Sequence, residues 1–139
     1  MYILDTNVVS ELRKIHAGKA DSRVSAWVQT VNMNELYVSV ITVQELEIGV
    51  RRIERRDPAQ GKVFRAWLND QVLPAFSERI LPIDTAVALR SASLHVPNPQ
   101  PIRDGLIAAT ALVHGMTVVT RNISDFKSSR VPVLNPWEF

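Results

Sequence analysis

Three carboxylates stand where predicted strands and helices would bring them to one edge of a sheet. Asp5 ends the apolar run that opens the chain, Glu45 follows the apolar run 36–41, and Asp104 opens the helix-like segment 105–112. Open α/β sheets bind ligands at the carboxyl ends of their strands. Three carboxylates gathered there would repel one another unless they share protons or cations. We therefore predict a divalent-metal site of oxygen ligands, of the kind that binds Mg²⁺ or Mn²⁺.

Each of these acids also has a purely structural interpretation. Asp5 or Thr6 could cap the first helix. Thr42 and Glu45 have the spacing of a capping box, in which a hydroxyl and a carboxylate satisfy the first N–H groups of a helix. Asp104 would lie in a first helical turn, where the helix dipole favours an acid. Taken together, three such coincidences at one sheet edge are less persuasive than a shared site.

Small residues near the acids predict a close helix contact. Gly49 lies one turn after Glu45 on the same helical face, and Ala108 and Ala111 continue the face of Asp104. Glycine inside a helix is about 1 kcal/mol less favourable than alanine, so its presence needs a reason. We predict that the two helices approach each other closely beneath the acids.

The periodicity predicts an α/β fold in which strands alternate with helices. This alternation is typical of a parallel sheet covered by helices on both faces. Pro82 in the third predicted strand indicates an edge position, and Asp84 is interpreted as a helix cap. Predicted strands cover 1–4, 36–40, 80–83, 117–120 and 131–134; predicted helices cover 6–14, 22–31, 42–56, 58–72, 85–94 and 104–114.

Bulk composition limits the classes of protein. A chain of 139 residues predicts a single domain spanning 1–139. No cysteine is present, which excludes a disulfide framework and a thiolate nucleophile. No apolar run approaches the ~20 residues of a membrane span, and the N-terminus does not resemble a secretion signal. We expect a cytoplasmic protein without membrane contact.

The positions of the basic residues indicate the kind of substrate better than the net charge of +2 does. One cluster lies around a helix end, and a second lies near the later acids. A basic rim around acidic residues suits a polyanionic substrate held at a metal centre. The alternative is that the arginines line solvated helix faces and compensate helix dipoles. The two clusters are Arg51, Arg52, Arg55 and Arg56, and Arg103, Arg121, Lys127 and Arg130.

Other site chemistries fit the sequence less well. A haloacid-type phosphohydrolase would need a second aspartate where Asn7 stands. No Gly-x-x-x-x-Gly-Lys pattern occurs, so a phosphate-cradling loop is absent. The three histidines, His16, His95 and His114, have no metal-ligand spacing.

The ordered set of motifs resembles the PIN domain, and more narrowly the VapC and FitB type of toxin from bacterial type II toxin–antitoxin modules. The resemblance extends from Met1 to the closing Asn-Pro-Trp at 135–137. The motifs that carry it are DTNVVSE at 5–11, ITVQEL at 41–46 followed by Gly49, DGLIAATA at 104–111, and TRN at 120–122 followed by Asp125 and Phe126.

This resemblance implies an α/β/α sandwich with a parallel sheet of four or five strands and the activity of a metal-dependent endoribonuclease. Asp5, Glu45 and Asp104 match the metal-site acids of the family. Family members often carry a fourth acid where this chain has Asn122, and Asp125 lies three residues further on.

The same resemblance assigns further roles. Thr6 and Thr120 match hydroxyl positions that support the acids or bound water, and Asn7 and Asn122 are expected to support the same site. Asp5 and Asp104 would be the principal metal ligands. Glu45 would bind a second ion or orient the attacking water. Asp125 is a further expected metal ligand, and Arg103 and Arg121 are the expected contacts to the RNA backbone.

Two other functions stay open at this stage. One is a catalytically weakened PIN-like module that binds RNA or a protein partner, which the neutral Asn122 favours. The other is a phospho-acceptor receiver domain, which also gathers acids around Mg²⁺. A receiver would need a lysine after the last strand, and none follows the predicted strand 131–134.

The expected partners are RNA, a small antitoxin laid over the site and a second copy of the chain. The predicted helices 42–56 and 58–72 carry more apolar surface than one small sheet can cover, and leftover apolar area usually becomes an interface. We predict a two-fold homodimer through this region. The apolar residues concerned are Ile48, Ile53, Val63, Phe64, Trp67, Leu68 and Val72.

Overall fold

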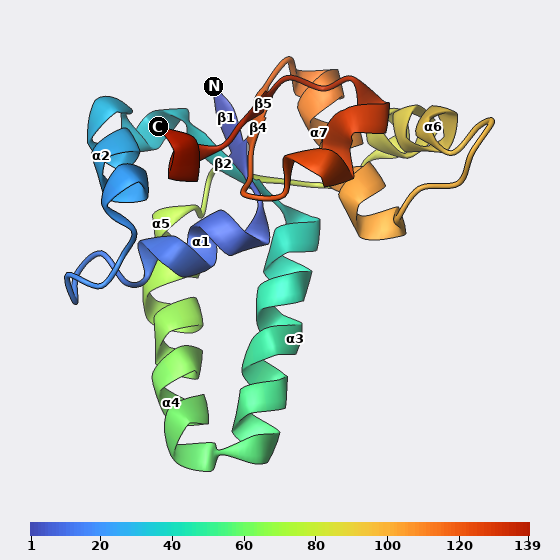
Figure 1. Ribbon diagram of the computed structural model, residues 1–139. Coiled ribbons are helices and arrows are strands. Elements are labelled where there is room, and N and C mark those ends of the chain that lie inside the picture. Colours follow the sequence, from blue (N-terminus) through green and yellow to red (C-terminus); the bar gives the residue numbers. More distant parts are fainter.

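The computed structural model describes residues 1–139 and contains one five-stranded parallel sheet in the order β3-β2-β1-β4-β5 (Figure 1). The α/β prediction is therefore confirmed. Pro82 follows β3, which is an edge strand as predicted. The strands are β1 Tyr2–Leu4, β2 Leu36–Ser39, β3 Ile80–Leu81, β4 Thr117–Val119 and β5 Val133–Leu134.

The helices between these strands follow most of the predicted boundaries to within one or two residues. None of them is both long and apolar enough to cross a membrane. The α-helices are α1 Thr6–Leu12, α2 Ser22–Thr30, α3 Val40–Arg56, α4 Pro58–Trp67, α5 Leu73–Ala75, α6 Thr85–Leu94 and α7 Ile102–His114. Shorter or wider turns form η1 Met33–Glu35, η2 Leu68–Val72, η3 Ile123–Ser129 and η4 Pro136–Glu138.

Two apolar cores lie on opposite faces of the sheet. Successive side chains of a strand point to opposite faces, so the fully buried Ile3 and Leu4 of the central strand enter different cores. Leu4 packs with Trp27 of α2 and other residues of α1, α3 and η2. Ile3 packs with Ile107 of α7 and Phe126 of η3. The predicted α/β/α sandwich is confirmed.

Local capping explains where several helices begin and end. The side chain of Asp21 accepts hydrogen bonds from the N–H groups of Arg23 and Val24, and that of Asp84 accepts one from Val87. Gly115 ends α7 in the left-handed conformation (φ 67°), which glycine adopts without the penalty of a Cβ. The cap by Asp84 confirms the prediction made from the sequence.

The predicted start of the third helix at Thr42 is wrong. Helix α3 begins at Val40, because the hydroxyl of Ser39 accepts a hydrogen bond from the N–H of Ile41 at 3.0 Å and caps the helix two residues earlier. The capping box from Thr42 to Glu45 is therefore not formed. Glu45 instead lies in the second turn of α3, where its side chain is free to serve another purpose.

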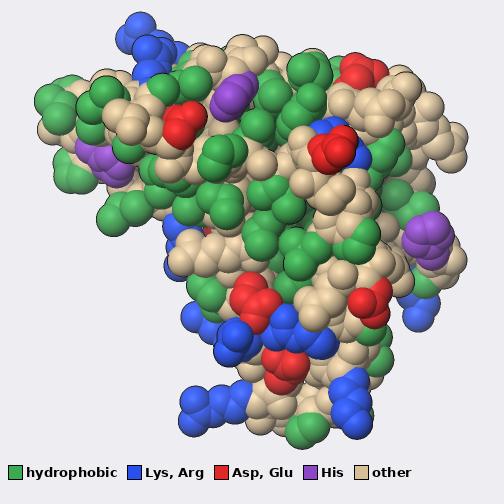
Figure 2. Space-filling model, turned by 180° about the vertical axis from the view of Figure 1, so that it is seen from behind, with side chains coloured by type: hydrophobic (Ala, Val, Ile, Leu, Met, Phe, Trp, Pro, Cys, Tyr) green, Lys and Arg blue, Asp and Glu red, His purple; other side chains and the backbone are tan.

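Helices α3 and α4 form a hairpin that extends away from the sheet (Figure 1). Arg65 of α4 ties the two helices together through ion pairs with Glu47 at 2.6 Å and Glu54 at 2.9 Å. Glu47 also pairs with Arg51 one turn further along α3. On the reverse side of the molecule, acidic and basic side chains alternate along this lower arm (Figure 2).

Two packing predictions that involve these helices are wrong. No atom beyond its own helix lies within 4 Å of the place where a Cβ on Gly49 would stand, so the predicted close contact of α3 with α7 at this glycine does not form. A close approach of helices occurs instead between α3 and α4 at Gly61, where a Cβ would lie 2.5 Å from the Cα of Glu54. Leu68 and Val72, predicted as surplus surface, are buried in the core.

Candidate active site

Asp5 stands at the carboxyl end of the central strand and also caps α1. One of its oxygens accepts a hydrogen bond from the N–H of Thr6 at 2.8 Å. The other accepts hydrogen bonds from the hydroxyl of Thr120 at 2.8 Å and the amide of Asn7 at 3.2 Å. Burial raises the pKa of this carboxyl, and the three hydrogen bonds oppose that rise. The structural and the functional interpretation of Asp5 are therefore compatible.

A small polar network fixes this acid in place. Thr120 follows β4, and its hydroxyl accepts hydrogen bonds from the N–H of Asn122 at 3.0 Å and from the amide of Asn7 at 3.3 Å. The side-chain amide oxygen of Asn7 accepts a hydrogen bond from the N–H of Arg121 at 3.1 Å. The network joins the start of α1 to the turn after β4, so the orientation of Asp5 depends on two segments far apart in the sequence.

Glu45 reaches the same region from α3. Its Oε1 accepts a hydrogen bond from the hydroxyl of Thr6 at 2.7 Å, which links it to the residue directly after Asp5. Its Oε2 lies 3.8 Å from the guanidinium of Arg103 on α7. Helices α1, α3 and α7 therefore meet at the carboxylate of Glu45. The Thr6 hydroxyl was expected to support the site, and it does so by contacting Glu45.

Asp104 occupies the first turn of α7 and is half-buried. No hydrogen bond or ion pair engages its carboxylate. Burial, followed by the negative charges of Asp5, Asp125 and Glu45, raises the pKa of Asp104 to about 6. The negative charges of the other three acids therefore disfavour the ionised form of Asp104.

A cleft of about 730 Å³ opens between α3 and the start of α7. Glu45, Arg103 and Asp104 stand in its wall, so acids and a cation face the same space. Apolar and amide side chains complete the wall, namely Ile41, Gln44, Ile48, Pro101, Ile102 and Leu106. A polyanion entering this cleft would meet Arg103 beside the carboxylates.

The donor set suits a hard divalent cation. Asp5, Glu45 and Asp104 offer oxygen ligands only, and their charges disfavour one another in the absence of a cation. No group of three or more acidic or histidine side chains is placed to hold a metal ion together. Mg²⁺ needs fewer protein ligands, because it keeps several waters and is bound through one or two carboxylates. The unpaired Asp104 and the fixed Asp5 therefore fit this kind of ion.

Asp125 and Asn122 both lie after β4 but differ in position. Asp125 is exposed on η3, and its charge raises the pKa of both Asp5 and Asp104. Asn122 precedes η3, and its backbone N–H donates to Thr120. Asp125 therefore contributes to the negative potential of the site.

We expect Asp125→Asn to weaken Mn²⁺ binding about three- to tenfold, because one of the nearby negative charges is lost. Isothermal titration calorimetry with Mn²⁺ measures this, with Asp70→Asn, an exposed acid of η2, as the matched control. An affinity equal to that of the wild type would assign Asp125 to structure. In that case the acid introduced by Asn122→Asp should raise the affinity for a second ion.

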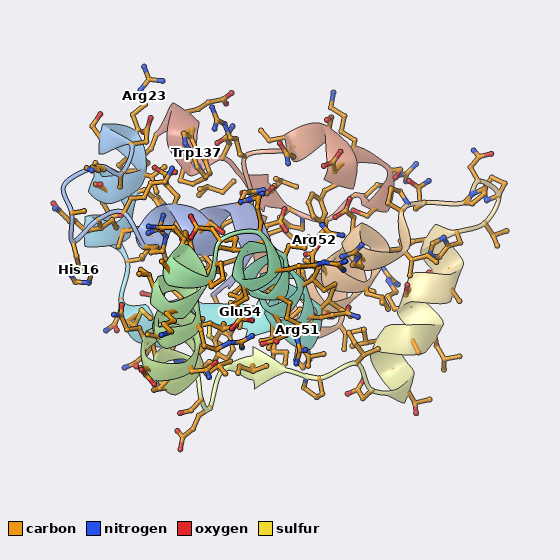
Figure 3. All side chains as sticks on the ribbon, turned by 90° about the horizontal axis from the view of Figure 1, so that it is seen from below. His16, Arg23, Arg51, Arg52, Glu54 and Trp137 are labelled. Carbon is orange, nitrogen blue, oxygen red and sulfur yellow. The ribbon has the colours of Figure 1, made fainter.

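Of the two arginines expected to contact RNA beside the acids, Arg103 and Arg121, only Arg103 forms an ion pair with one of the acids. Arg103 contacts Glu45, whereas the guanidinium of Arg121 lies 5.2 Å from the ring centroid of Trp137. Arg51 pairs with Glu47 on the hairpin. Viewed along the hairpin, Arg51 and Glu54 lie on one side of α3, and Arg52 points in a different direction (Figure 3).

The fold and the position of these acids define the class of protein, and comparison agrees with them. The family model described as the PIN domain matches residues 2–128. The chain therefore belongs to the PIN-domain family, as its motifs indicated.

Within this family the chain is similar to several named proteins over its whole length. It is 38% identical over 145 residues to the VapC ribonuclease Y4jK of Sinorhizobium fredii, with 99% of each chain covered. It is 38% identical over 143 residues to the toxin FitB of Neisseria gonorrhoeae, again with 99% of each chain covered. The crystal structure of FitAcB from Neisseria gonorrhoeae matches with a TM-score of 0.89 at 36% identity and full coverage of both chains.

A second solved structure, that of FitAB bound to the IR36 DNA fragment, gives a TM-score of 0.88 at 35% identity and covers 100% of this chain and 97% of the other. Both matches extend over all five strands and the hairpin. The fold assignment therefore holds for all 139 residues described.

Proposed function

We propose that this protein is a metal-dependent endoribonuclease that acts as the toxin of a type II toxin–antitoxin module, with residues 1–139 working as one domain. The observation that carries the proposal is the pair of carboxylates from two helices, Glu45 and Asp104, in the wall of one open cleft of a PIN domain, with the charge of Asp5 acting on Asp104. The names of the full-length relatives, a VapC ribonuclease and the toxin FitB, support the same function.

In this proposal each acid has a distinct task. Asp5, held by Thr120, Asn7 and the N–H of Thr6, is a rigid ligand for Mg²⁺ or Mn²⁺. Asp104 has no competing partner and is free to turn toward the ion. When bound, the ion offsets negative charge on the phosphate and makes a nearby water more acidic.

Glu45 is placed to orient the attacking water or to hold a second ion. The hydrogen bond from Thr6 fixes one of its oxygens, and the second oxygen faces the cleft beside Arg103. A carboxylate held in this way can accept a proton from a water in the cleft. Arg103 would hold the phosphate backbone without reading its sequence, because a phosphate contact carries no base information. Arg121 is proposed to do the same.

A cleavage assay tests this function. Purified protein is incubated with total RNA in Mg²⁺, in Mn²⁺ and in chelator, and the products are resolved on a denaturing gel. We expect cleavage only with a metal ion. Binding of RNA without cleavage in either metal would instead identify a weakened PIN-like module that acts as a binding protein.

A small antitoxin is the proposed protein partner. The similar FitB chain is solved as FitAB and as FitAcB, which are assemblies with a second protein. By similarity, an antitoxin segment would lie over the cleft and bring a cation to the acids, in competition with the metal ion. The location in the cytoplasm remains a prediction.

The outer face of α4 is the proposed homodimer surface. Val63 is 54% exposed, and it lines a shallow groove of about 850 Å³ with Trp67, Ala66 and Ala75. Ile48, Ile53 and Phe64 remain partly exposed, but the burial of Leu68 and Val72 leaves less surplus apolar area than the sequence indicated. A two-fold contact between copies would cover Val63.

We expect a dimer mass by light scattering at micromolar concentration and a monomer mass for Val63→Glu, because a buried unpaired charge at the contact is unfavourable. Lys62→Glu, an exposed charge change on the neighbouring residue, serves as the control. A monomeric wild type, or a Val63→Glu variant that remains a dimer, would remove this surface from consideration.

A further inference from the structure

A second hollow, which sequence analysis missed, adjoins the acids on the other side of Glu45. It has a volume of about 220 Å³ and is lined by residues of α1, α3 and α4. In the ribbon diagram α1 lies between the sheet and the hairpin of α3 and α4 (Figure 1). Its walls come from one face of each helix. The lining residues are Thr6, Ser10, Arg13, Lys14, Glu45, Leu46, Gly49, Val50, Ile53, Phe64 and Trp67.

The hollow has an acidic end and a basic end. Thr6 and Ser10 line the hollow about one helical turn apart on α1, and Arg13 and Lys14 line it directly after that helix ends at Leu12. Thr6 donates to Glu45 at one end. Arg13 and Lys14 lie at the other end, where Lys14 also pairs with Glu11. A bound ligand that extends from the acids along this hollow would therefore reach the positively charged side chains of Arg13 and Lys14.

Gly49 leaves the middle of the hollow open. It lies one turn from Glu45 on the same face of α3, and nothing outside its own helix stands within 4 Å of the position that its Cβ would occupy. A glycine in the interior of a helix is unfavourable and has no packing reason here. Any larger side chain at this position would project into the hollow, so the glycine preserves space beside the acids.

An aromatic wall faces this space. Phe64 and Trp67 of α4 line it and contact each other edge to face, with ring centroids 6.4 Å apart. The guanidinium of Arg13 lies 4.4 Å from the centroid of the Phe64 ring. Aromatic side chains combined with arginine are the features on which the bases of single-stranded nucleic acid stack.

We propose that this hollow is a subsite for one nucleotide of single-stranded RNA, next to the phosphate cleaved at the acids. The base occupies the space left by Gly49 against Phe64 and Trp67, and the adjoining phosphate is neutralised by Arg13 and Lys14. This subsite rests on the proposed ribonuclease function. Its volume suits a single base, and its continuity with Glu45 together with the cations favours RNA over a protein side chain.

The test compares two probes in chelator, where RNA is not cut. One is a fluorescent 12-mer of riboadenylate, and the other is an abasic ribose-phosphate 12-mer of equal charge. We expect the wild type to prefer the riboadenylate probe, and Gly49→Leu to weaken that binding roughly tenfold while leaving the abasic probe unchanged. Gly49→Leu should fold, because leucine favours a helix more than glycine does; Gly49→Ala is the smaller replacement if it does not.

A second variant tests the basic end. Arg13→Gln should weaken both probes by several-fold, because it removes a phosphate contact. Arg90→Gln, which removes an exposed arginine of α6, should weaken neither. Equal loss in both arginine variants would indicate a general charge effect and overturn the assignment of Arg13.

The remaining outcomes separate this subsite from the nuclease function. Metal-dependent cleavage by the wild type, together with unchanged probe binding by Gly49→Leu, would overturn the subsite and leave the nuclease intact. Loss of antitoxin inhibition in Gly49→Leu with unchanged RNA binding would show that the hollow receives a protein side chain, and the proposal would be wrong. Absence of cleavage by the wild type under all metal conditions would contradict the proposed function itself.

Discussion

Asp5→Asn and Asp104→Asn are each expected to reduce metal-dependent cleavage of RNA by roughly 100-fold or more, because each removes a proposed ligand of the ion. The amide that replaces the Asp5 carboxylate keeps one oxygen that can accept a hydrogen bond from the N–H of Thr6 or the hydroxyl of Thr120, so the start of α1 should remain in place. The loss of activity should therefore occur in a folded protein.

Stability measurements separate a lost ligand from a lost fold. Asp104 is repelled by Asp5, Asp125 and Glu45 in the absence of a cation. Asp104→Asn should therefore melt at the same temperature as the metal-free wild type or higher. Added Mn²⁺ should raise the melting temperature of the wild type, because a ligand that binds only the folded state stabilises it, and should do so much less in the variant.

Asp84→Asn is the matched control, since Asp84 caps α6 and asparagine caps nearly as well. It should cleave RNA as the wild type does. Full activity in Asp5→Asn or Asp104→Asn, with unchanged dependence on metal concentration, would show that the site has been assigned to the wrong residues.

Gly61→Ala is expected to lower the melting temperature by about 5–10 °C, which corresponds to roughly 1–3 kcal/mol. The added Cβ would lie 2.5 Å from the Cα of Glu54, and a backbone atom cannot move aside as the end of a side chain can. Helices α3 and α4 would have to separate. The ion pairs from Arg65 to Glu47 and Glu54 would lengthen as a result.

Gly49→Ala provides the opposite result in the same hairpin. Its Cβ would enter open space, so the gain in helix propensity of about 1 kcal/mol should appear as a melting temperature a few degrees higher. Differential scanning calorimetry measures both variants. If Gly61→Ala were as stable as the wild type, the close contact between α3 and α4 at this position would be incorrect.

The sequence by itself determined the features that depend on nearby residues. Asp21 and Asp84 cap their helices because a side-chain oxygen reaches N–H groups two or three residues away. Asp5 could be placed at a strand end because an apolar run is followed at once by an acid. The alternation of strands and helices predicted the parallel sheet, since such a sequence has few other ways to bury both faces.

Only the tertiary structure decided how distant residues meet. Thr6 and Glu45, 39 positions apart, share a hydrogen bond, and Thr120 fixes Asp5 across 115 positions. The start of α3 depended on a choice between the two hydroxyls of Ser39 and Thr42, and the backbone leaving β2 favoured the first.

The two helical glycines of the hairpin show most clearly that local sequence does not reveal contacts between distant residues. Gly49 and Gly61 have the same local signal, an unfavourable residue inside a helix. One leaves a hollow open beside the acids, and the other allows two backbones to touch. Helix propensity depends on the residue within its own helix, whereas the reason for each glycine lies in the space or the contact between that helix and its neighbours.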